Sequence, residues 1–178
     1  IKAIADRHGI PVLEDTAQAA GCRLHGKHLG SFGAVGTFSF DAVKTMTTGE
    51  GGMCITNDAA LWQRMSEYQD HGHDHVPNPG GRGGEGRPFV GFNFRMMEIQ
   101  GAIGLAQLAK LDAMVAAQQK NKQFFQEAAS VLPGVEYREI LDPAGDSATF
   151  FCFLLPDKDR TTAVNQVLRE AGVGAVRW

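Results

Sequence analysis

The chain has 178 residues, of which 43% are hydrophobic and 21% charged, and its formal net charge is -3. These values are typical of a globular protein with one domain, or with one domain and part of another. The charge gives no electrostatic reason to expect nucleic acid or an anionic membrane as a partner, and no apolar run approaches the roughly 20 residues of a membrane-spanning helix. The three cysteines lack metal-site spacing, so we expect a reduced, cytoplasmic setting.

The first part of the sequence predicts an alternation of helix and strand. Residues 1–8 have apolar side chains at helical spacing, and Gly9 marks the end of that helix. The run "IPVLED" predicts a short buried strand that ends in Glu14 and Asp15, and "TFSF" and "GGMCITN" predict two further strands. A helix followed by a buried strand is typical of a parallel α/β sheet, where functional groups gather at the carboxyl ends of the strands.

The middle of the sequence predicts two helices separated by a long loop. The run "DAALWQRMSEYQDH" predicts a helix that begins at Asp58. Residues 71–88 are rich in glycine and proline and predict a long loop, which in compact domains is usually functional or disordered. A long helical pattern then runs from about Met96 to about Val131.

The last part of the sequence predicts a second α/β unit, with strands in "GVEYREIL" and "TFFCFLLP" and a helix in "RTTAVNQVLREAG". We therefore expect residues 1–115 to be part of a large domain. Residues 116–178 would hold the end of the long helix and the beginning of a smaller C-terminal domain. The sequence opens in helical register without an initiator methionine, which predicts a fragment of a longer protein.

The side chains of Lys44 and Asp15 together suit the binding of one type of cofactor. Lys44 lies between a strand-like apolar run and a cluster of threonines and glycines. A lysine amine shielded from water can act as a nucleophile and bond to an aldehyde, and a strand-end carboxylate can hold a pyridine nitrogen protonated. Hydroxyl and N–H groups nearby could bind a phosphate. This is the protein's share of pyridoxal-phosphate chemistry, yet many unrelated α/β proteins also have an acid after a strand and a lysine in a loop.

Four segments occur in one order: "PVLEDTAQAAG", "GSFGAVGTFSF", "VKTMTTGEGG" and "GFNFRMMEIQGAIGLAQLAKLD". Together they resemble the DegT/DnrJ/EryC1/StrS family of sugar aminotransferases, which are fold-type-I enzymes dependent on pyridoxal phosphate. The resemblance covers most of residues 1 to about 115 and continues weakly beyond. It implies an α/β fold with a mixed, mostly parallel sheet and flanking helices.

The resemblance also implies a role for each matching residue. Lys44 matches the lysine that binds the cofactor covalently and afterwards moves a proton. Asp15 matches the aspartate that pairs with the pyridine nitrogen, and Gln18 matches the glutamine that contacts the phenolic oxygen of the ring. Ser39 matches a phosphate-binding serine. Asn93 resembles a residue that reaches the cofactor phosphate of the neighbouring subunit.

At three positions the sequence departs from the family pattern or matches it in more than one way. Arg95 lies beside Asn93 in "GFNFR", and either could reach the phosphate. Val43 precedes the lysine where the family often has His or Asn, and Ala20 stands where many members have His. Both changes could alter contacts with the substrate.

The function that the resemblance implies is transfer of an amino group from glutamate or glutamine to a keto or aldehyde sugar, within a homodimer that shares its active sites. The sugar would be nucleotide-linked, or a keto-deoxy-octulosonate-type sugar, because the long loop and "VKT" resemble that branch. The product would serve cell-surface polysaccharide synthesis. One alternative is a sugar dehydratase, in which His replaces the lysine, so Lys44 argues against it. Another is a non-catalytic folded piece.

The segment "DHGHDH", residues 70–75, offers histidines and aspartates that could bind zinc. Its spacing matches no closed structural site, and we expect no metal. His71 and His73 could instead shape a sugar or phosphate pocket together with Arg82 and Arg87. A solvated loop without a specific role is the other reading.

Overall fold

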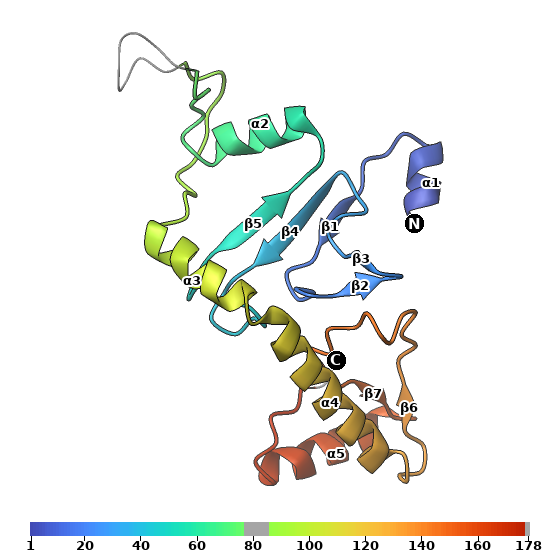
Figure 1. The fold of residues 1–178 in the computed structure, drawn as a ribbon. Coiled ribbons are helices and arrows are strands. Elements are labelled where there is room, and N and C mark those ends of the chain that lie inside the picture. The colour runs from blue at the N-terminus through green and yellow to red at the C-terminus, as the bar shows by residue number, and fades with distance from the viewer. Residues whose placement is uncertain (77–85, 177–178) are drawn as a thin grey trace.

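The computed structural model describes residues 1–76 and 86–176. Three of the described strands form the main sheet. Figure 1 shows this sheet in the upper half of the molecule and a smaller helix-rich part below it, with the long helix α4 (Leu111–Ala129) leading from one to the other. In chain order the elements are α1 (Lys2–Arg7), β1 (Leu13–Asp15), β2 (Arg23–Leu24), β3 (Lys27–His28), β4 (Val35–Ser39), β5 (Gly52–Ile55), α2 (Ala59–Tyr68), α3 (Glu98–Leu108), α4 (Leu111–Ala129), β6 (Glu136–Tyr137), β7 (Phe153–Leu154) and α5 (Lys158–Glu170).

The sheet has the strand order β1-β4-β5. Strand β1 pairs with β4 in parallel, with Asp15 opposite Thr37, and β4 pairs with β5 in antiparallel register, with Ser39 opposite Gly52. The predicted mixed sheet is therefore present, with parallel pairing between β1 and β4. Since parallel strands end at the same edge, the carboxyl ends of β1 and β4 lie side by side.

Helix α2 begins where the sequence predicts. The Asp58 side chain accepts hydrogen bonds from the backbone N–H groups of Ala60 and Leu61, at 2.8 Å and 3.0 Å. These donors have no partner inside the helix, so the aspartate satisfies groups that would otherwise need water.

The single long helix predicted from Met96 to Val131 is wrong, because the structure divides it into α3 and α4. The backbone N–H of Lys110 donates to the carbonyl oxygen of Gln107, three residues back, at 2.9 Å. This tighter turn interrupts the helical ladder of bonds between residues four apart. The break spans only two residues, so the apolar periodicity continues across it. Among the helices in the described residues, none has both the length and the apolar sequence needed to cross a membrane.

The two predicted C-terminal strands are also shorter than expected. Only Glu136–Tyr137 and Phe153–Leu154 pair, because residues 142–149 between them bond to other parts of the molecule. The backbone N–H of Arg23 donates to the carbonyl of Gly145 at 2.7 Å. The aromatic rings of Tyr137 and Phe151 lie 6.0 Å apart beneath α4 and form part of a small aromatic cluster.

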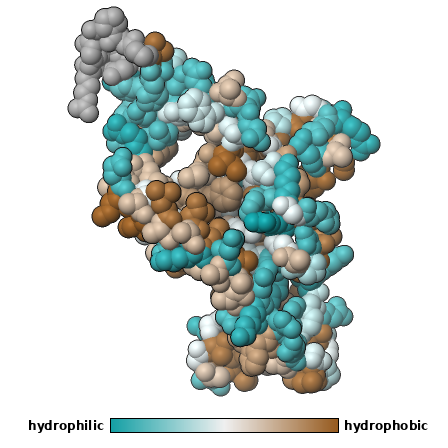
Figure 2. Space-filling view, in the orientation of Figure 1, coloured by the Kyte–Doolittle hydropathy of each residue, from teal (hydrophilic) through white to brown (hydrophobic). Residues whose placement is uncertain are grey.

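The prediction that β1 is a buried strand is wrong for the described residues. Leu13 is 66% exposed, because β1 is an edge strand of the described sheet and no described helix packs closely on it. Buried apolar side chains gather instead after β4, at Phe40 and Met46. Hydrophobic residues over α3 remain at the surface, as Figure 2 shows.

Glu14 fixes the loop that leads into β4. Its carboxylate accepts backbone N–H bonds from Gly30, Phe32 and Gly33 at 2.7, 2.6 and 2.5 Å. A side chain at Gly33 would place its Cβ 2.3 Å from the carbonyl oxygen of Val12, so only glycine allows this close approach. The strand-end glutamate thus has a structural role.

Replacing Glu14 with alanine should lower the free energy of unfolding of the full-length protein by about 3 kcal/mol. Hydrogen bonds to charged acceptors each contribute about 1.5–3 kcal/mol, and partial exposure of the carboxylate reduces the sum. Urea denaturation of the cofactor-free protein measures the change. Glu139, which is exposed, provides the control, and Glu139→Ala should stay within about 0.5 kcal/mol of wild type. Equal stability of the two variants would contradict the role of Glu14.

Candidate functional site

Residues 40–51 form a loop between β4 and β5, which we call the lysine loop. Its base is closed by a hydrogen bond from the backbone N–H of Phe40 to the carbonyl of Gly51, at 2.8 Å. The Thr48 N–H donates back to the Phe40 carbonyl at 2.9 Å, and the Lys44 N–H donates to the Asp41 carbonyl at 3.0 Å. Lys44 therefore stands on a backbone that is fixed by its own hydrogen bonds.

The glycine-rich end of the lysine loop is attached to α3. The carbonyl oxygen of Glu50 accepts hydrogen bonds from Thr48 Oγ1 at 2.6 Å and from Gln100 Nε2 at 2.8 Å. Gly51 has φ +151°, and a Cβ there would lie 2.6 Å from Thr48 Oγ1. Glycine at this position therefore allows the loop to close tightly.

Lys44 itself is half-buried. Lysine side chains are mostly exposed, and this one stands next to the buried side chains of Phe40 and Met46 in the same loop. Within residues 1–76 and 86–176, its Nζ has no hydrogen bond or ion pair. The amine is therefore available to a ligand.

Asp15 and Ser39 end two neighbouring parallel strands. The Asp15 carboxylate accepts only the backbone N–H of Ala17, at 3.1 Å, in the part of the chain that the structure describes. Ser39 Oγ accepts the N–H of Asp41 at 3.4 Å, at the entry to the lysine loop. A carboxylate and a hydroxyl thus lie at the carboxyl end of the sheet, where the lysine loop begins.

Gln18 lies in the turn that follows β1 and is exposed. The turn is held by Thr16, whose backbone N–H and Oγ1 both donate to the carbonyl of Thr37, at 2.9 Å and 2.5 Å. The Ala19 N–H closes the turn onto the Thr16 carbonyl at 2.9 Å. The structure therefore places Asp15, Gln18, Ser39 and Lys44 at one edge of the sheet.

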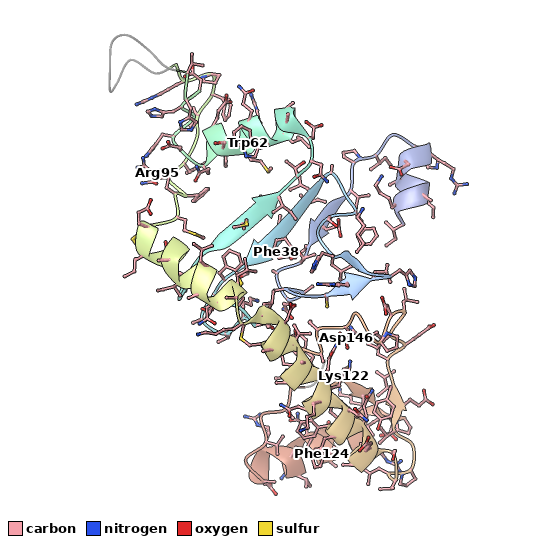
Figure 3. All side chains as sticks on the ribbon, viewed as in Figure 1. Phe38, Trp62, Arg95, Lys122, Phe124 and Asp146 are labelled. Carbon is pink, nitrogen blue, oxygen red and sulfur yellow. The ribbon has the colours of Figure 1, made fainter. Side chains whose placement is uncertain are left out.

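Asn93 lies on a different segment from these four residues. It forms an isolated bridge with Asp70 after α2, on the segment that leads to α3. Arg95 Nε donates to Asn93 Oδ1 at 3.2 Å, and Arg95 Nη1 pairs with Asp70 Oδ1 at 3.1 Å. Figure 3 shows Arg95 at the outer side of this segment, away from Phe38 in β4.

The loop from His71 onward is only partly described. His75 Nε2 lies 3.7 Å from Asp70 Oδ2, and the rings of His71 and His73 are 6.0 Å apart. No three His, Cys, Asp or Glu residues gather as metal ligands within the described ranges. Arg82 lies outside the described residues, so the proposed pocket of histidines and arginines stays a prediction.

One contact of the lysine loop could not be predicted from the sequence. Thr45 Oγ1, next to Lys44, lies 3.4 Å from Thr149 Oγ1 and 3.5 Å from Gln118 Nε2. These partners are 104 and 73 positions away, so no local pattern could indicate them.

Comparison with known proteins identifies the relatives of this arrangement. Residues 1–177 match the DegT/DnrJ/EryC1/StrS aminotransferase family. The GDP-perosamine synthase of Caulobacter vibrioides is 46% identical over 117 residues, which are 66% of this chain and 30% of that protein. The L-glutamine:2-deoxy-scyllo-inosose aminotransferase of Streptomyces kanamyceticus is 35% identical over 185 residues, 97% of this chain and 42% of that protein.

Solved structures share the fold. Helicobacter pylori PseC, an aminotransferase involved in the biosynthesis of pseudoaminic acid, has a TM-score of 0.85 and 26% identity over 97% of this chain and 46% of that one. Escherichia coli GDP-4-keto-6-deoxy-D-mannose-3-dehydratase, solved with bound hydrated PLP, has a TM-score of 0.84 and 27% identity over 97% and 47%. These similarities confirm the predicted α/β fold class of fold type I. The chain spans less than half the length of these relatives.

Proposed function

Since the chain belongs to the DegT/DnrJ/EryC1/StrS aminotransferase family, we propose that the whole protein is a pyridoxal-phosphate-dependent aminotransferase. It transfers an amino group from glutamate or glutamine to the carbonyl carbon of a sugar. The observation that carries this proposal is a half-buried lysine with an unpaired amine, within the described residues, at the sheet edge that also holds Asp15, Gln18 and Ser39.

The chemistry of these side chains fits the cofactor. When bound, pyridoxal phosphate supplies an electron sink for the substrate carbon that loses or gains the amino group. The Asp15 carboxylate suits a protonated ring nitrogen, and the Gln18 amide suits the ring's phenolic oxygen. The Ser39 hydroxyl suits the phosphate.

Lys44 has two tasks in this proposal. Its amine holds the cofactor covalently, and after release it moves a proton between the substrate carbon and the cofactor. Both tasks need an amine that returns to the same position. The closed backbone of the lysine loop and the buried Phe40 and Met46 provide that constraint.

We propose a nucleotide-linked ketosugar as the acceptor, or a keto-deoxy-octulosonate-type sugar as the resemblance of the long loop suggests. The names of the Caulobacter and Streptomyces relatives support a sugar or a sugar-like ring. The likeness to the E. coli dehydratase supports sugar dehydration as a second candidate. Lys44 disfavours it, because the family resemblance implies His in place of the lysine in dehydratases. The product would enter cell-surface polysaccharide synthesis in the cytoplasm.

We also propose that the protein works as a homodimer in which Asn93 reaches the cofactor phosphate of the other subunit. Two observations support this. Asn93 lies on a different segment from the other site residues, and large hydrophobic side chains on that segment and on α3 are exposed, as a surface covered by a second copy would be (Figure 2). They are Val90, Phe92, Phe94, Met97, Ile99, Leu105 and Leu108.

Lys44→Ala should abolish covalent attachment of the cofactor and lower the rate of amino transfer by more than about 10³-fold, as the loss of a nucleophile and proton carrier requires. Attachment is measured in the full-length protein by borohydride reduction, proteolysis and mass spectrometry. Lys120 is an exposed lysine on α4, and Lys120→Ala should retain wild-type attachment and rate. Cofactor mass on any other peptide would refute the assignment of Lys44.

The acceptor class is tested by nitrogen transfer. Full-length protein with pyridoxal phosphate is incubated with ¹⁵N-labelled glutamate or glutamine (amino-labelled) and a panel of ketosugars, both nucleotide-linked and of the keto-deoxy-octulosonate type. We expect one sugar product to carry the label by mass spectrometry. A product that has lost water and gained no nitrogen would establish the dehydratase alternative. Absence of any turnover by a protein with attached cofactor would refute the sugar assignment.

The shared site is tested by mixing subunits. Lys44→Ala and Asn93→Asp should each be nearly inactive, the latter because a carboxylate repels phosphate. Co-expression of the two variants forms mixed dimers in which one site has both substitutions and the other has neither. About a quarter of wild-type activity should return, since half of the dimers are mixed. Activity that stays at the sum of the two variants would place Asn93 in its own subunit's site, or outside any site.

A further inference from the structure

We propose that Thr149 is a positioning residue for Lys44, acting through the hydroxyl of Thr45. This inference rests on the proposed role of Lys44. Thr149 belongs to the 142–149 segment, which lies between β6 and β7 and contacts α4 through Asp146 and the lysine loop through Thr149.

A continuous chain of hydrogen bonds leads from this segment to the lysine loop. Cys22 Sγ and Ser147 Oγ are 3.1 Å apart, Ser147 Oγ and Thr149 Oγ1 are 2.9 Å apart, and Thr149 Oγ1 is 3.4 Å from Thr45 Oγ1. Gln118 Nε2, on α4, lies 3.5 Å from the same Thr45 oxygen. Thr45 is thus the point at which three separate parts of the chain meet beside Lys44.

The 142–149 segment is itself firmly held. Lys122 on α4 pairs with Asp146, and the two side chains are only 14% and 18% exposed. Gln119 Nε2 donates to the Asp146 carbonyl at 2.8 Å, and the Asp142 carboxylate accepts the His25 N–H at 2.6 Å. A segment anchored on two sides can hold its threonine in one place.

The backbone of this segment is strained where it presents its hydroxyls. Ala148 has φ +55°, a left-handed conformation that costs a non-glycine residue free energy, and it is 8% exposed. This conformation lets Ser147 and Thr149 bond to each other on the side that faces Cys22 and Thr45. Such strain persists where surrounding contacts fix a required geometry.

The distances decide how strong the coupling is. The bonds within the segment are of ordinary length, whereas the two bonds to Thr45 are long, so each contributes less than a typical hydrogen bond. We therefore expect Thr149 to limit excursions of the lysine loop by a factor of about three, without being required for folding of the loop.

Hydrogen exchange of the cofactor-free, full-length protein tests the proposal. The amides of Lys44 and Thr48 are hydrogen-bonded within the loop and report its opening. Thr149→Val keeps the shape and removes the hydroxyl, and should speed their exchange about threefold. Thr149→Ser restores the hydroxyl and should return exchange to the wild-type rate. Thr161→Val removes a threonine hydroxyl that bonds within α5, and should leave the loop unchanged.

A second readout follows attachment of the cofactor. The rate at which pyridoxal phosphate becomes borohydride-trapped on Lys44 should fall about threefold in Thr149→Val and recover in Thr149→Ser. If Thr149→Val does not fold, Thr45→Val replaces it, because this change removes the hydroxyl through which Thr149 would act. Wild-type exchange and attachment rates in the folded variant would overturn the proposal. Absence of attachment in the wild type would instead refute the function of Lys44 and leave the exchange result to decide positioning.

Discussion

The Glu14 carboxylate holds three backbone N–H groups of the loop before β4, and in doing so it sets how β4 lies beside β1. The next residue, Asp15, ends β1 opposite Thr37, whose carbonyl receives both donors of Thr16. The carboxylate that fixes the loop, Glu14, and the one proposed to meet the cofactor, Asp15, are therefore adjacent in sequence and point to opposite faces, as strand geometry requires. A slip of one residue would exchange their places and remove the site.

In the lysine loop, a small number of buried side chains support the backbone that carries Lys44. Phe40 and Met46 are buried within it, while much of the described sheet remains exposed. Local hydrogen bonds close the loop, and Gln100 and Thr149 attach it to α3 and to the 142–149 segment. The position of Lys44 therefore depends on contacts within the loop and with α3 and residues 142–149, and hardly at all on what covers the faces of the sheet.

The local features of this fold could be predicted from the sequence, but the long-range contacts could not. Asp58 as the start of α2 and the strands around Lys44 follow from capping and apolar patterns. The break at Ala109–Lys110 has no glycine or proline to signal it, and the exposure of Leu13 depends on which elements cover β1. The roles of Asp15, Gln18, Ser39 and Lys44 came from family resemblance. These residues lie at the same end of the sheet because β1 and β4 pair in parallel. The division at residue 115 stays a prediction.

The pairing of Arg95 bears on which residue of "GFNFR" could offer donors to a phosphate. Arg95 already bonds to a largely buried carboxylate, that of Asp70, which is 17% exposed, and this partner offsets its charge. Its Nε also occupies the amide oxygen of Asn93. An amide whose oxygen accepts one bond presents its NH₂ group in the opposite direction. Arg95 and Asp70 therefore favour Asn93 as the residue that meets an anion, with Arg95 holding it in orientation. The two residues that the sequence could not distinguish therefore have different partners: Arg95 pairs with Asp70, and Asn93 accepts a bond from Arg95.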